Sequence, residues 1–357
     1  MDGAGRELPF DLGPFAELPR ACRTPELLAA AAAVDQAVAA AAREILAEVG
    51  EEEEAIPPER RPAHRWLRAF LAQRPIAEDP GARLAAELGP ARLRPYTEAA
   101  LALVERAARS YPAFLRGEVL GAQVLFAAEA LPLWERYFSA ANLTNHAINA
   151  QTAALAERTT RGRKGLRALE VGGGCGSSGA LLLEVLGERV ACYTYTDIAP
   201  ALIARGRRTL RAVPTRAERT FRRLDIDRPP AEQGVPPGSV DLLCGVNVLH
   251  AARDLVRCLR SLREALAPGG TLVLGEAVRP RPDAALAIEF VFQLAEGFRR
   301  FTPVEGLRER GGFLWWEAWP ELLRRAGFAA VETAPRDMSA ALRALPSYSL
   351  CALAATP

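Results

Sequence analysis

One glycine-rich segment, LEVGGGCGSSG at 169–179, restricts the possible folds of this chain more than any other feature. The pattern E-x-G-x-G-x-G is formed by Glu170, Gly172, Gly174 and Gly176 directly after a short apolar run. Glycines there let the backbone turn tightly and approach a ligand closely before a following helix begins. The same segment also fits the dinucleotide fingerprint G-x-G-x-x-G, so by itself it leaves two classes of nucleotide site open.

Short apolar runs alternate with helical patterns in the second half of the chain. The runs that predict strands are 166–171, 191–196, 220–226, 240–246 and 271–276. Helical patterns between them cover 178–187, 199–211 and 253–267. Such alternation is typical of a parallel sheet with crossover helices. After a last helix over 317–326, two strands at 329–334 and 347–355 are joined by a short loop, which predicts an antiparallel edge pair.

The first 160 residues have helical patterns, and no tract alternates with period two for long enough to predict a strand. Thr24 is predicted to cap a helix that begins at Pro25 and ends near Gly50. Further helices are predicted over 61–73, 97–110 and 122–140. We therefore expect a helical accessory domain over 1–160 and an α/β domain over 161–357.

Composition excludes several functions. With 45 Lys and Arg against 43 Asp and Glu, the net charge of +2 argues against a basic nucleic-acid-binding face. Lys164 is the only lysine, which excludes a Tyr-x-x-x-Lys reductase site. The six cysteines form no C-x-x-C pair and there are three histidines, so neither a metal site nor a disulfide framework is expected. The first ten residues have no apolar signal region, and the longest apolar run, 27–42, contains Asp35. We expect a cytoplasmic protein without membrane association.

Two aspartates follow predicted strands. Asp197 ends the second strand, where a carboxylate can accept hydrogen bonds from ribose hydroxyls. The alternative is a turn or helix cap before Pro200. Asp225 ends the third strand, where its side chain could reach an adenine amino group, and the alternative is an ordinary turn aspartate.

Five motifs, in order, resemble class I S-adenosylmethionine-dependent methyltransferases, and more narrowly the C- and O-methyltransferase domains of polyketide synthases. They are EVGGGCG, YTYTDIAPAL, LDIDRPPAEQG, VNVLHAARDL and LAPGGTLVLGE. The resemblance covers about residues 110–355. It implies a Rossmann-like, seven-stranded α/β sheet of order 3-2-1-4-5-7-6, preceded by a helical lid.

The resemblance also implies S-adenosylmethionine as the cofactor. The residues that it places around the cofactor are Glu170, Gly172, Gly174 and Gly176 at the methionine part, Asp197 at the ribose, Asp225 and Ile226 at the adenine, and Asn247 near the sulfonium.

His250 and Glu276 are the candidate catalytic pair. They follow the fourth strand and end the fifth, which are neighbours in the implied sheet, so both should lie in the crevice at the strand ends. A hydroxyl or an activated methylene is a poor nucleophile until a base removes its proton, and histidine titrates near neutral pH. The resemblance implies the same His–Glu dyad. The alternatives are a structural histidine and a carboxylate that caps the sheet edge.

The substrate side is predicted in the aromatic-rich insertion 277–316 and the N-terminal helices, which could form an apolar pocket. Candidate contacts are Tyr137, Glu289 and Trp315, with core packing as the alternative for each. We expect a polyketide-like small molecule, either free or tethered to an acyl carrier protein. The oligomeric state is not predicted.

Three other functions stay open alongside methyl transfer to carbon or oxygen in a polyketide-like pathway. A small-molecule O-methyltransferase with a helical dimerisation domain usually has Asp-Trp after the histidine, whereas here Ala251 and Ala252 follow. A nicotinamide-dependent oxidoreductase shares the glycine loop but not the closing strand pair. A non-methylating cyclase or scaffold on the same fold is the third.

Overall fold

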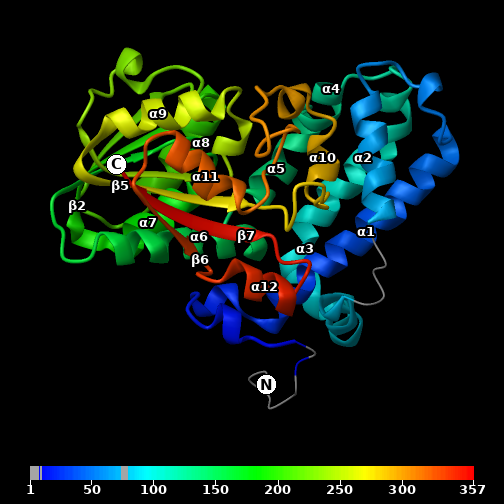
Figure 1. The fold of residues 1–357 in the computed structure, drawn as a ribbon, viewed down its shortest axis with the longest axis horizontal. Coiled ribbons are helices and arrows are strands. Elements are labelled where there is room, and N and C mark those ends of the chain that lie inside the picture. Colours follow the sequence, from blue (N-terminus) through cyan, green and yellow to red (C-terminus); the bar gives the residue numbers. More distant parts are fainter. Residues whose placement is uncertain (1–7, 9, 74–78) are drawn as a thin grey trace.

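The computed structural model describes residues 8, 10–73 and 79–357 and contains a seven-stranded sheet of order β3-β2-β1-β4-β5-β7-β6 (Figure 1). The strands are β1 (Leu166–Glu170), β2 (Val190–Asp197), β3 (Glu218–Arg223), β4 (Val240–Val246), β5 (Leu266–Ala277), β6 (Ala330–Ala334) and β7 (Leu350–Thr356). The first five are parallel, and β7 runs antiparallel to both β5 and β6. The predicted sheet order is confirmed.

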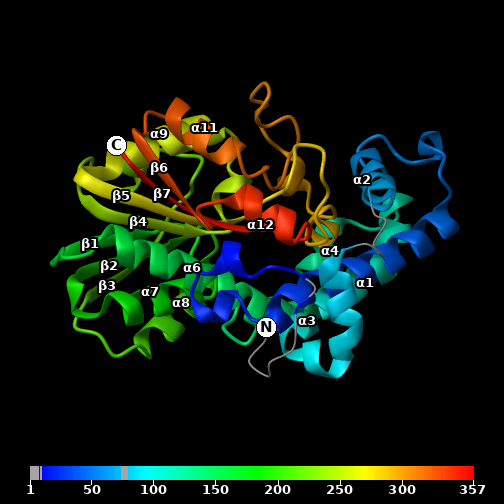
Figure 2. The same cartoon turned by 60° about the horizontal axis from the view of Figure 1, so that its bottom comes forward.

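Helices cover both faces of this sheet. Their bounds are α1 (Pro25–Val49), α2 (Arg61–Ala72), α3 (Pro80–Leu115), α4 (Gly121–Leu125), α5 (Leu131–Tyr137), α6 (Leu143–Thr159), α7 (Ser177–Leu186), α8 (Pro200–Arg211), α9 (Leu255–Ala265), α10 (Glu289–Phe292), α11 (Ala318–Arg325) and α12 (Met338–Ala344). Figure 2 shows α9 and α11 on one face and α6, α7 and α8 on the other. Helices α1, α2 and α3 form a separate layer beside the sheet.

The N-terminal layer confirms part of the helix prediction. Thr24 caps α1, because its side-chain oxygen accepts a hydrogen bond from the Leu27 amide at 3.2 Å. The helix predicted over 97–110 belongs to the longer α3, which has a kink at Gly89. The continuous helix predicted over 122–140 is wrong: it is divided into α4 and α5, since a proline in the first turn of α5 cannot extend a preceding helix.

Helix α6 lies against the sheet although it precedes residue 160. It contacts β5 and β7, and the Cys22 thiol donates a hydrogen bond to the Ala147 carbonyl of α6 at 3.1 Å. The hydrophobic core around the sheet therefore includes side chains from the N-terminal stretch, among them Phe15 and Leu27. A second core joins α1–α5 to the insertion after β5. The division at residue 160 stays a prediction.

The last two strands confirm the predicted antiparallel pair, but their connection is more ordered than the expected loop. It contains α12, which Asp337 caps by accepting a hydrogen bond from the Ala340 amide at 2.8 Å. Helix α1 is long and apolar enough to cross a membrane by length and composition alone. In this structure its buried residues pack against α3, and the expectation of no membrane association stays a prediction.

Candidate active site

His250 and Glu276 meet where β4 and β5 end. The imidazole Nδ1 of His250 lies 2.7 Å from Oε2 of Glu276. Glu276 is 0% exposed and His250 is 7% exposed. The other carboxylate oxygen, Oε1, accepts hydrogen bonds from the backbone amides of Leu249 at 2.9 Å and Val248 at 3.2 Å. Glu276 thus binds both the imidazole ring and the first turn of the short 3₁₀ helix that carries it, Leu249–Ala251.

The surroundings of His250 favour one orientation of its ring. The Phe313 ring packs with its centroid 4.2 Å from that of the imidazole, and Phe298 lies at 6.1 Å. An ionised Glu276 can only accept a hydrogen bond, so Nδ1 donates and Nε2 carries the lone pair. Nε2 makes no hydrogen bond to any of the described residues. This arrangement can accept a proton at Nε2.

The glycine loop lies directly beside this pair. Gly172 and Gly174 have φ values of 61° and 57°, in the left-handed region that favours glycine. A Cβ added at Gly172 would lie 2.2 Å from a methyl of Val248, so the loop packs tightly against the segment before His250. A Cβ at Gly174 would meet no atom within 4 Å, so that side of the loop faces open space. Gly176 precedes the first residue of α7. The loop can therefore accommodate a ligand that approaches its backbone closely.

Glu170 lies buried beneath the glycine loop. Its Oε2 accepts a hydrogen bond from the Tyr193 hydroxyl at 2.7 Å, and Oε1 accepts one from the Ser178 hydroxyl. Burial raises the pKa of the Glu170 carboxyl, and the two hydroxyl donors act in the opposite direction. Both oxygens have protein partners in this structure, so Glu170 supports the loop from below.

The two aspartates of the predicted cofactor site make local contacts. Asp197 Oδ2 accepts a hydrogen bond from the Gly174 amide at 3.0 Å, and Oδ1 accepts one from Ala199 at 2.9 Å. Burial raises the pKa of the Asp197 carboxyl. Asp225 and Ile226 are half-buried just beyond β3, and Asp225 Oδ1 accepts a hydrogen bond from the Asp227 amide at 2.9 Å. Asp197 therefore fixes the glycine loop and also caps its own turn, and Asp225 has the contacts of a turn aspartate.

Asn247 is the one non-glycine residue with positive φ, 50°, among those that the structure describes. Its amide donates to the Gly275 carbonyl at 2.7 Å, and its Oδ1 accepts a hydrogen bond from the Ala277 amide at 2.8 Å. These two hydrogen bonds, one through the backbone of Asn247 and one through its side chain, join the end of β4 to β5. Backbone strain of this kind is common at functional sites, and sequence reasoning had no means of detecting it.

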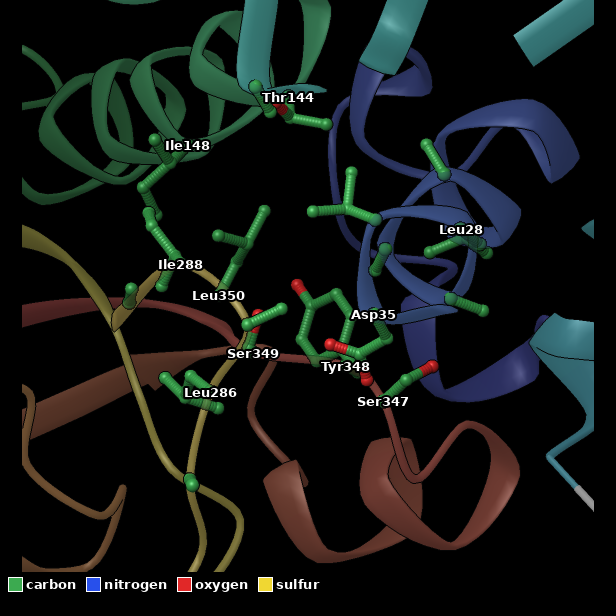
Figure 3. A pocket seen from close by; sticks show the side chains of 18 of the residues that line it. Leu28, Asp35, Thr144, Ile148, Leu286, Ile288, Ser347, Tyr348, Ser349 and Leu350 are labelled. Carbon is green, nitrogen blue, oxygen red and sulfur yellow. The ribbon is translucent and has the colours of Figure 1, made fainter. Parts of the chain in front are cut away.

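A cavity of about 510 Å³ adjoins this edge of the sheet. Figure 3 shows its walls, with Leu28 and Asp35 from α1, Ile148 from α6, and Ile288 from the insertion after β5. Other walls come from the segment that enters β7. The lining is mostly apolar, and the polar or titratable side chains in it include Asn247, Tyr137, Thr144, Asn145, Ser347 and Ser349. We call this cavity the chamber. The predicted apolar pocket between the insertion and the N-terminal helices is therefore present.

Two of the three predicted substrate contacts lie elsewhere. Tyr137 lines the chamber, but Glu289 is 0% exposed and forms an ion pair with Arg279. Its Oε2 also accepts a hydrogen bond from the Trp66 indole at 3.0 Å, so the predicted substrate contact at Glu289 is corrected to a structural one. Trp315 is half-buried against the core of the sheet and forms a β-bridge with Arg279. Neither Glu289 nor Trp315 is among the residues that line the chamber.

Two tyrosines of the cofactor side were not singled out from the sequence. Tyr193 and Tyr195 alternate on β2 and so point to the same face of the strand. Tyr193 binds Glu170, and the Tyr195 hydroxyl donates to the Gly174 carbonyl at 2.5 Å. The sequence feature that indicates them is the alternation YTYT in β2, because alternate residues of a strand point to the same face, here the face on which the glycine loop lies.

Comparison with known proteins identifies the central part of the chain. A sequence family described as a methyltransferase domain matches residues 169–272, which include the glycine loop, β2, β4 and His250. Residues 169–272 are a methyltransferase domain. The predictions of an S-adenosylmethionine-dependent methyltransferase and of S-adenosylmethionine as its cofactor are thereby confirmed, and the open cradle at Gly174 fits such a ligand.

Relatives of this methyltransferase domain include polyketide synthases. Highly reducing polyketide synthase 2 of Gibberella zeae is 31% identical over 238 residues, which is 64% of this chain and 9% of the synthase. The crystal structure of the CurJ carbon methyltransferase is 23% identical, with a TM-score of 0.70 and 90% coverage of both chains. The trans-methyltransferase CalH, solved in complex with SAH, is 24% identical, with a TM-score of 0.65 and coverage of 93% and 90%. The two structures share the fold, and the chain spans less than a tenth of the curated relatives it matches.

The described residues contain no group of three or more His, Cys, Asp or Glu that could hold a metal ion around the methyltransferase domain or elsewhere. The expectation that no metal is required stays a prediction, as do the cytoplasmic location and the roles of the individual site residues.

Proposed function

We propose that this methyltransferase transfers a methyl group to an activated carbon of a polyketide-like acyl substrate, with His250 as the general base and Glu276 as its support. The observation that carries the proposal is the 2.7 Å contact between His250 Nδ1 and Glu276 Oε2, beside the glycine loop. The likeness to the CurJ carbon methyltransferase and the homology to polyketide synthases support carbon as the acceptor.

The cofactor supplies an electrophilic methyl group on a sulfonium, whose leaving group departs without a proton. The chain's own task is then to align the acceptor and to raise its electron density. In the proposed mechanism, Nε2 of His250 takes a proton from the methylene between two carbonyl groups. Glu276 stabilises the imidazolium that forms, through its contact with Nδ1–H. Phe313 packs on the ring and keeps it from turning.

The chamber is the proposed site of the acyl chain. Its volume of about 510 Å³ lies in the range of small-molecule pockets, and its walls are mostly apolar. Asn247 and Ala277 line the part of the wall that belongs to the ends of β4 and β5. Asn247 directly follows β4, and Ala277 is the last residue of β5, next to Glu276. His250 and Glu276 do not line the chamber themselves, so the proposal is that the reactive end of the acyl chain lies at this part of the wall, beside the pair. Delivery by an acyl carrier protein is part of the proposal, with a free substrate as the alternative.

Methyl transfer to a hydroxyl is the second candidate, because a hydroxyl needs the same general base. The two candidates are separated by incubating the protein with methyl-labelled cofactor and either a 3-oxoacyl or a 3-hydroxyacyl thioester of N-acetylcysteamine. Fragment masses locate the label. Label on the carbon between the carbonyl groups supports the proposal, and label on the hydroxyl oxygen supports the second candidate.

Two controls complete this experiment. Calorimetric binding of S-adenosylhomocysteine shows that the protein is competent for the cofactor. Presenting the same acyl chain on an acyl carrier protein tests the proposed delivery. A protein that binds S-adenosylhomocysteine but methylates none of these acceptors would contradict the proposal and favour a non-methylating role.

A further inference from the structure

A buried arginine from the insertion after β5 contacts the backbone of the short helix that carries His250. Arg308 is 2% exposed. Its Nη2 donates a hydrogen bond to the carbonyl of His250 at 2.8 Å, and its Nη1 donates to the carbonyl of Ala252 at 2.7 Å. The turn that holds Arg308 is itself closed by hydrogen bonds between the backbones of Val304 and Arg308, at 3.0 and 2.8 Å. One side chain thus satisfies two carbonyl groups where the helix ends.

The opposite end of the same helix is held by Glu276. Its Oε1 accepts hydrogen bonds from the amides of Val248 and Leu249. The amide groups at the start of a helix carry partial positive charge and the carbonyl groups at its end carry partial negative charge. A carboxylate therefore lies at the positive end and a guanidinium at the negative end. His250, between them, has its backbone fixed from both sides.

Burying the Arg308 side chain costs free energy unless its hydrogen bonds to the carbonyl groups compensate for the lost hydration. A buried guanidinium loses its hydration, and among the described residues no carboxylate forms an ion pair with Arg308. Burial lowers the pKa of Arg308 to about 10, and Asp227 and Asp254 act in the opposite direction. The principal partners of the Arg308 guanidinium are the carbonyl groups of His250 and Ala252. The buried cation therefore stabilises the end of the helix Leu249–Ala251.

We infer that Arg308 is a positioning residue for the proposed reaction: it holds the helix Leu249–Ala251 so that the His250 imidazole keeps its contact with Glu276. This inference rests on the proposed function only for its catalytic consequence. The hydrogen bonds of Arg308 all go to backbone carbonyls, and its guanidinium also lies over the Phe301 ring at 5.5 Å, so it acts on the reaction through His250. Without the guanidinium, the two carbonyl groups lose their donors, and the helix is free to shift and turn the ring away from Glu276.

The test compares two variants with a matched control. Arg308→Met keeps most of the side-chain volume but removes the donors, and Arg308→Lys keeps the charge and part of the donors. Arg219→Met is the control, because Arg219 also donates to two carbonyls where a helix ends, those of Leu210 in the last turn of α8 and Val213 just after it. That end of α8 adjoins the N-terminal end of β3, opposite to the crevice.

The first measurement does not depend on activity. The chain has three histidines, so ¹⁵N spectra of the imidazole rings contain few signals, and the His250→Ala variant assigns the one of interest. We expect the neutral ring of His250 to carry its proton on Nδ1 in the wild-type protein and in Arg219→Met. In Arg308→Met we expect a mixture of both tautomers, with partial return to the wild-type spectrum in Arg308→Lys.

The second measurement uses labelled cofactor with the 3-oxoacyl thioester. We expect Arg308→Met to lower kcat by on the order of ten- to a hundredfold, with KM and S-adenosylhomocysteine affinity within about twofold of wild type. An unchanged His250 spectrum in Arg308→Met, or an equal change in Arg219→Met, would overturn the inference. If Arg308→Met does not fold, Arg308→Lys decides: partial appearance of the second tautomer together with a lowered kcat would support the inference, and an unchanged His250 spectrum would overturn it. If no acceptor is methylated, the proposed function fails, and the tautomer measurement still decides the role of Arg308.

Discussion

The hydroxyl of Tyr193 donates a hydrogen bond to Oε2 of Glu170 at 2.7 Å, in the layer directly beneath the glycine loop. Two residues along β2, Tyr195 makes the matching contact with the Gly174 carbonyl. A Cβ at Gly179 would lie 2.5 Å from the Tyr193 oxygen, and one at Gly173 would lie 2.2 Å from the Tyr195 ring. The loop therefore takes its shape from two tyrosines as well as from its glycines.

Removing either hydroxyl should loosen the loop. We expect Tyr193→Phe to lower the free energy of unfolding by about 1–3 kcal/mol, since it leaves a buried carboxyl oxygen without its donor, and Tyr195→Phe to lower it less. Both should weaken S-adenosylhomocysteine binding, as measured by calorimetry. The matched control is Tyr111→Phe, because the buried Tyr111 hydroxyl has no partner among the described residues. Unchanged S-adenosylhomocysteine affinity in both loop variants would contradict this role.

The buried Glu170 carboxyl should make stability depend on pH. Burial raises its pKa, so the folded protein keeps this proton to higher pH than the unfolded chain does. The stabilisation is then complete at low pH and is lost as pH rises through the raised pKa. We expect the free energy of unfolding of the wild type, minus that of Glu170→Gln, to fall as pH rises from about 4, the ordinary glutamate pKa, through the raised pKa of the folded protein. Urea denaturation at a series of pH values measures this difference. A difference that does not depend on pH would show that burial does not raise the pKa of the Glu170 carboxyl.

The dyad should be needed for turnover and not for cofactor binding. We expect His250→Ala to lower kcat by roughly 10²–10⁴-fold, the usual contribution of a general base. Glu276→Gln should also lower kcat, because an amide nitrogen facing Nδ1 would force the proton onto Nε2. S-adenosylhomocysteine affinity should change little in either variant. His146→Ala is the control, and wild-type turnover by His250→Ala would exclude this base.

The buried ion pair of Arg279 and Glu289 joins α2 to the insertion after β5 through Trp66. We expect Arg279→Met to lower the free energy of unfolding by about 3–5 kcal/mol, because it leaves a carboxylate buried without its cation. Replacing both residues by methionine should cost less than the single change. The exposed pair Arg300–Glu296 is the control, and its removal should have little effect on urea denaturation. Equal effects at the two pairs would contradict the structural role of Glu289.

Narrowing the chamber should weaken binding of the acyl acceptor and leave the affinity for the cofactor unchanged. Ile288 faces the chamber from the insertion (Figure 3). We expect Ile288→Trp to raise KM for a long-chain thioester by about tenfold, since overfilling a packed site costs about 1–3 kcal/mol. A short-chain thioester should be affected less. Val185→Trp, at an exposed position of α7, serves as the control. An equal rise in KM for long and short chains would argue against an acyl chain in the chamber.

Local pattern in the sequence determined the strands, their order of appearance and the loop between the first strand and its helix. Apolar runs, capping residues such as Thr24, and glycines with positive φ are preferences of neighbouring residues, so they can be read without knowing the fold. His250 and Glu276 could be paired because their strands are neighbours in the sheet that the motifs implied. The same reasoning misplaced Glu289, since an acidic residue among apolar ones has the same local pattern whether it meets a substrate or a buried arginine.

Only the tertiary structure decided which buried polar groups form hydrogen bonds or ion pairs with one another. The partner of Glu289 is 10 residues away and its second donor, Trp66, is 223 residues away. Arg308 reaches the carbonyl of His250 across 58 residues. A buried polar group must find a partner wherever the packed chain brings one close, and that condition depends on the complete arrangement of the elements. The glycine loop and the two dyad side chains were therefore determined by the sequence itself, whereas the contacts that hold them in place were decided by packing.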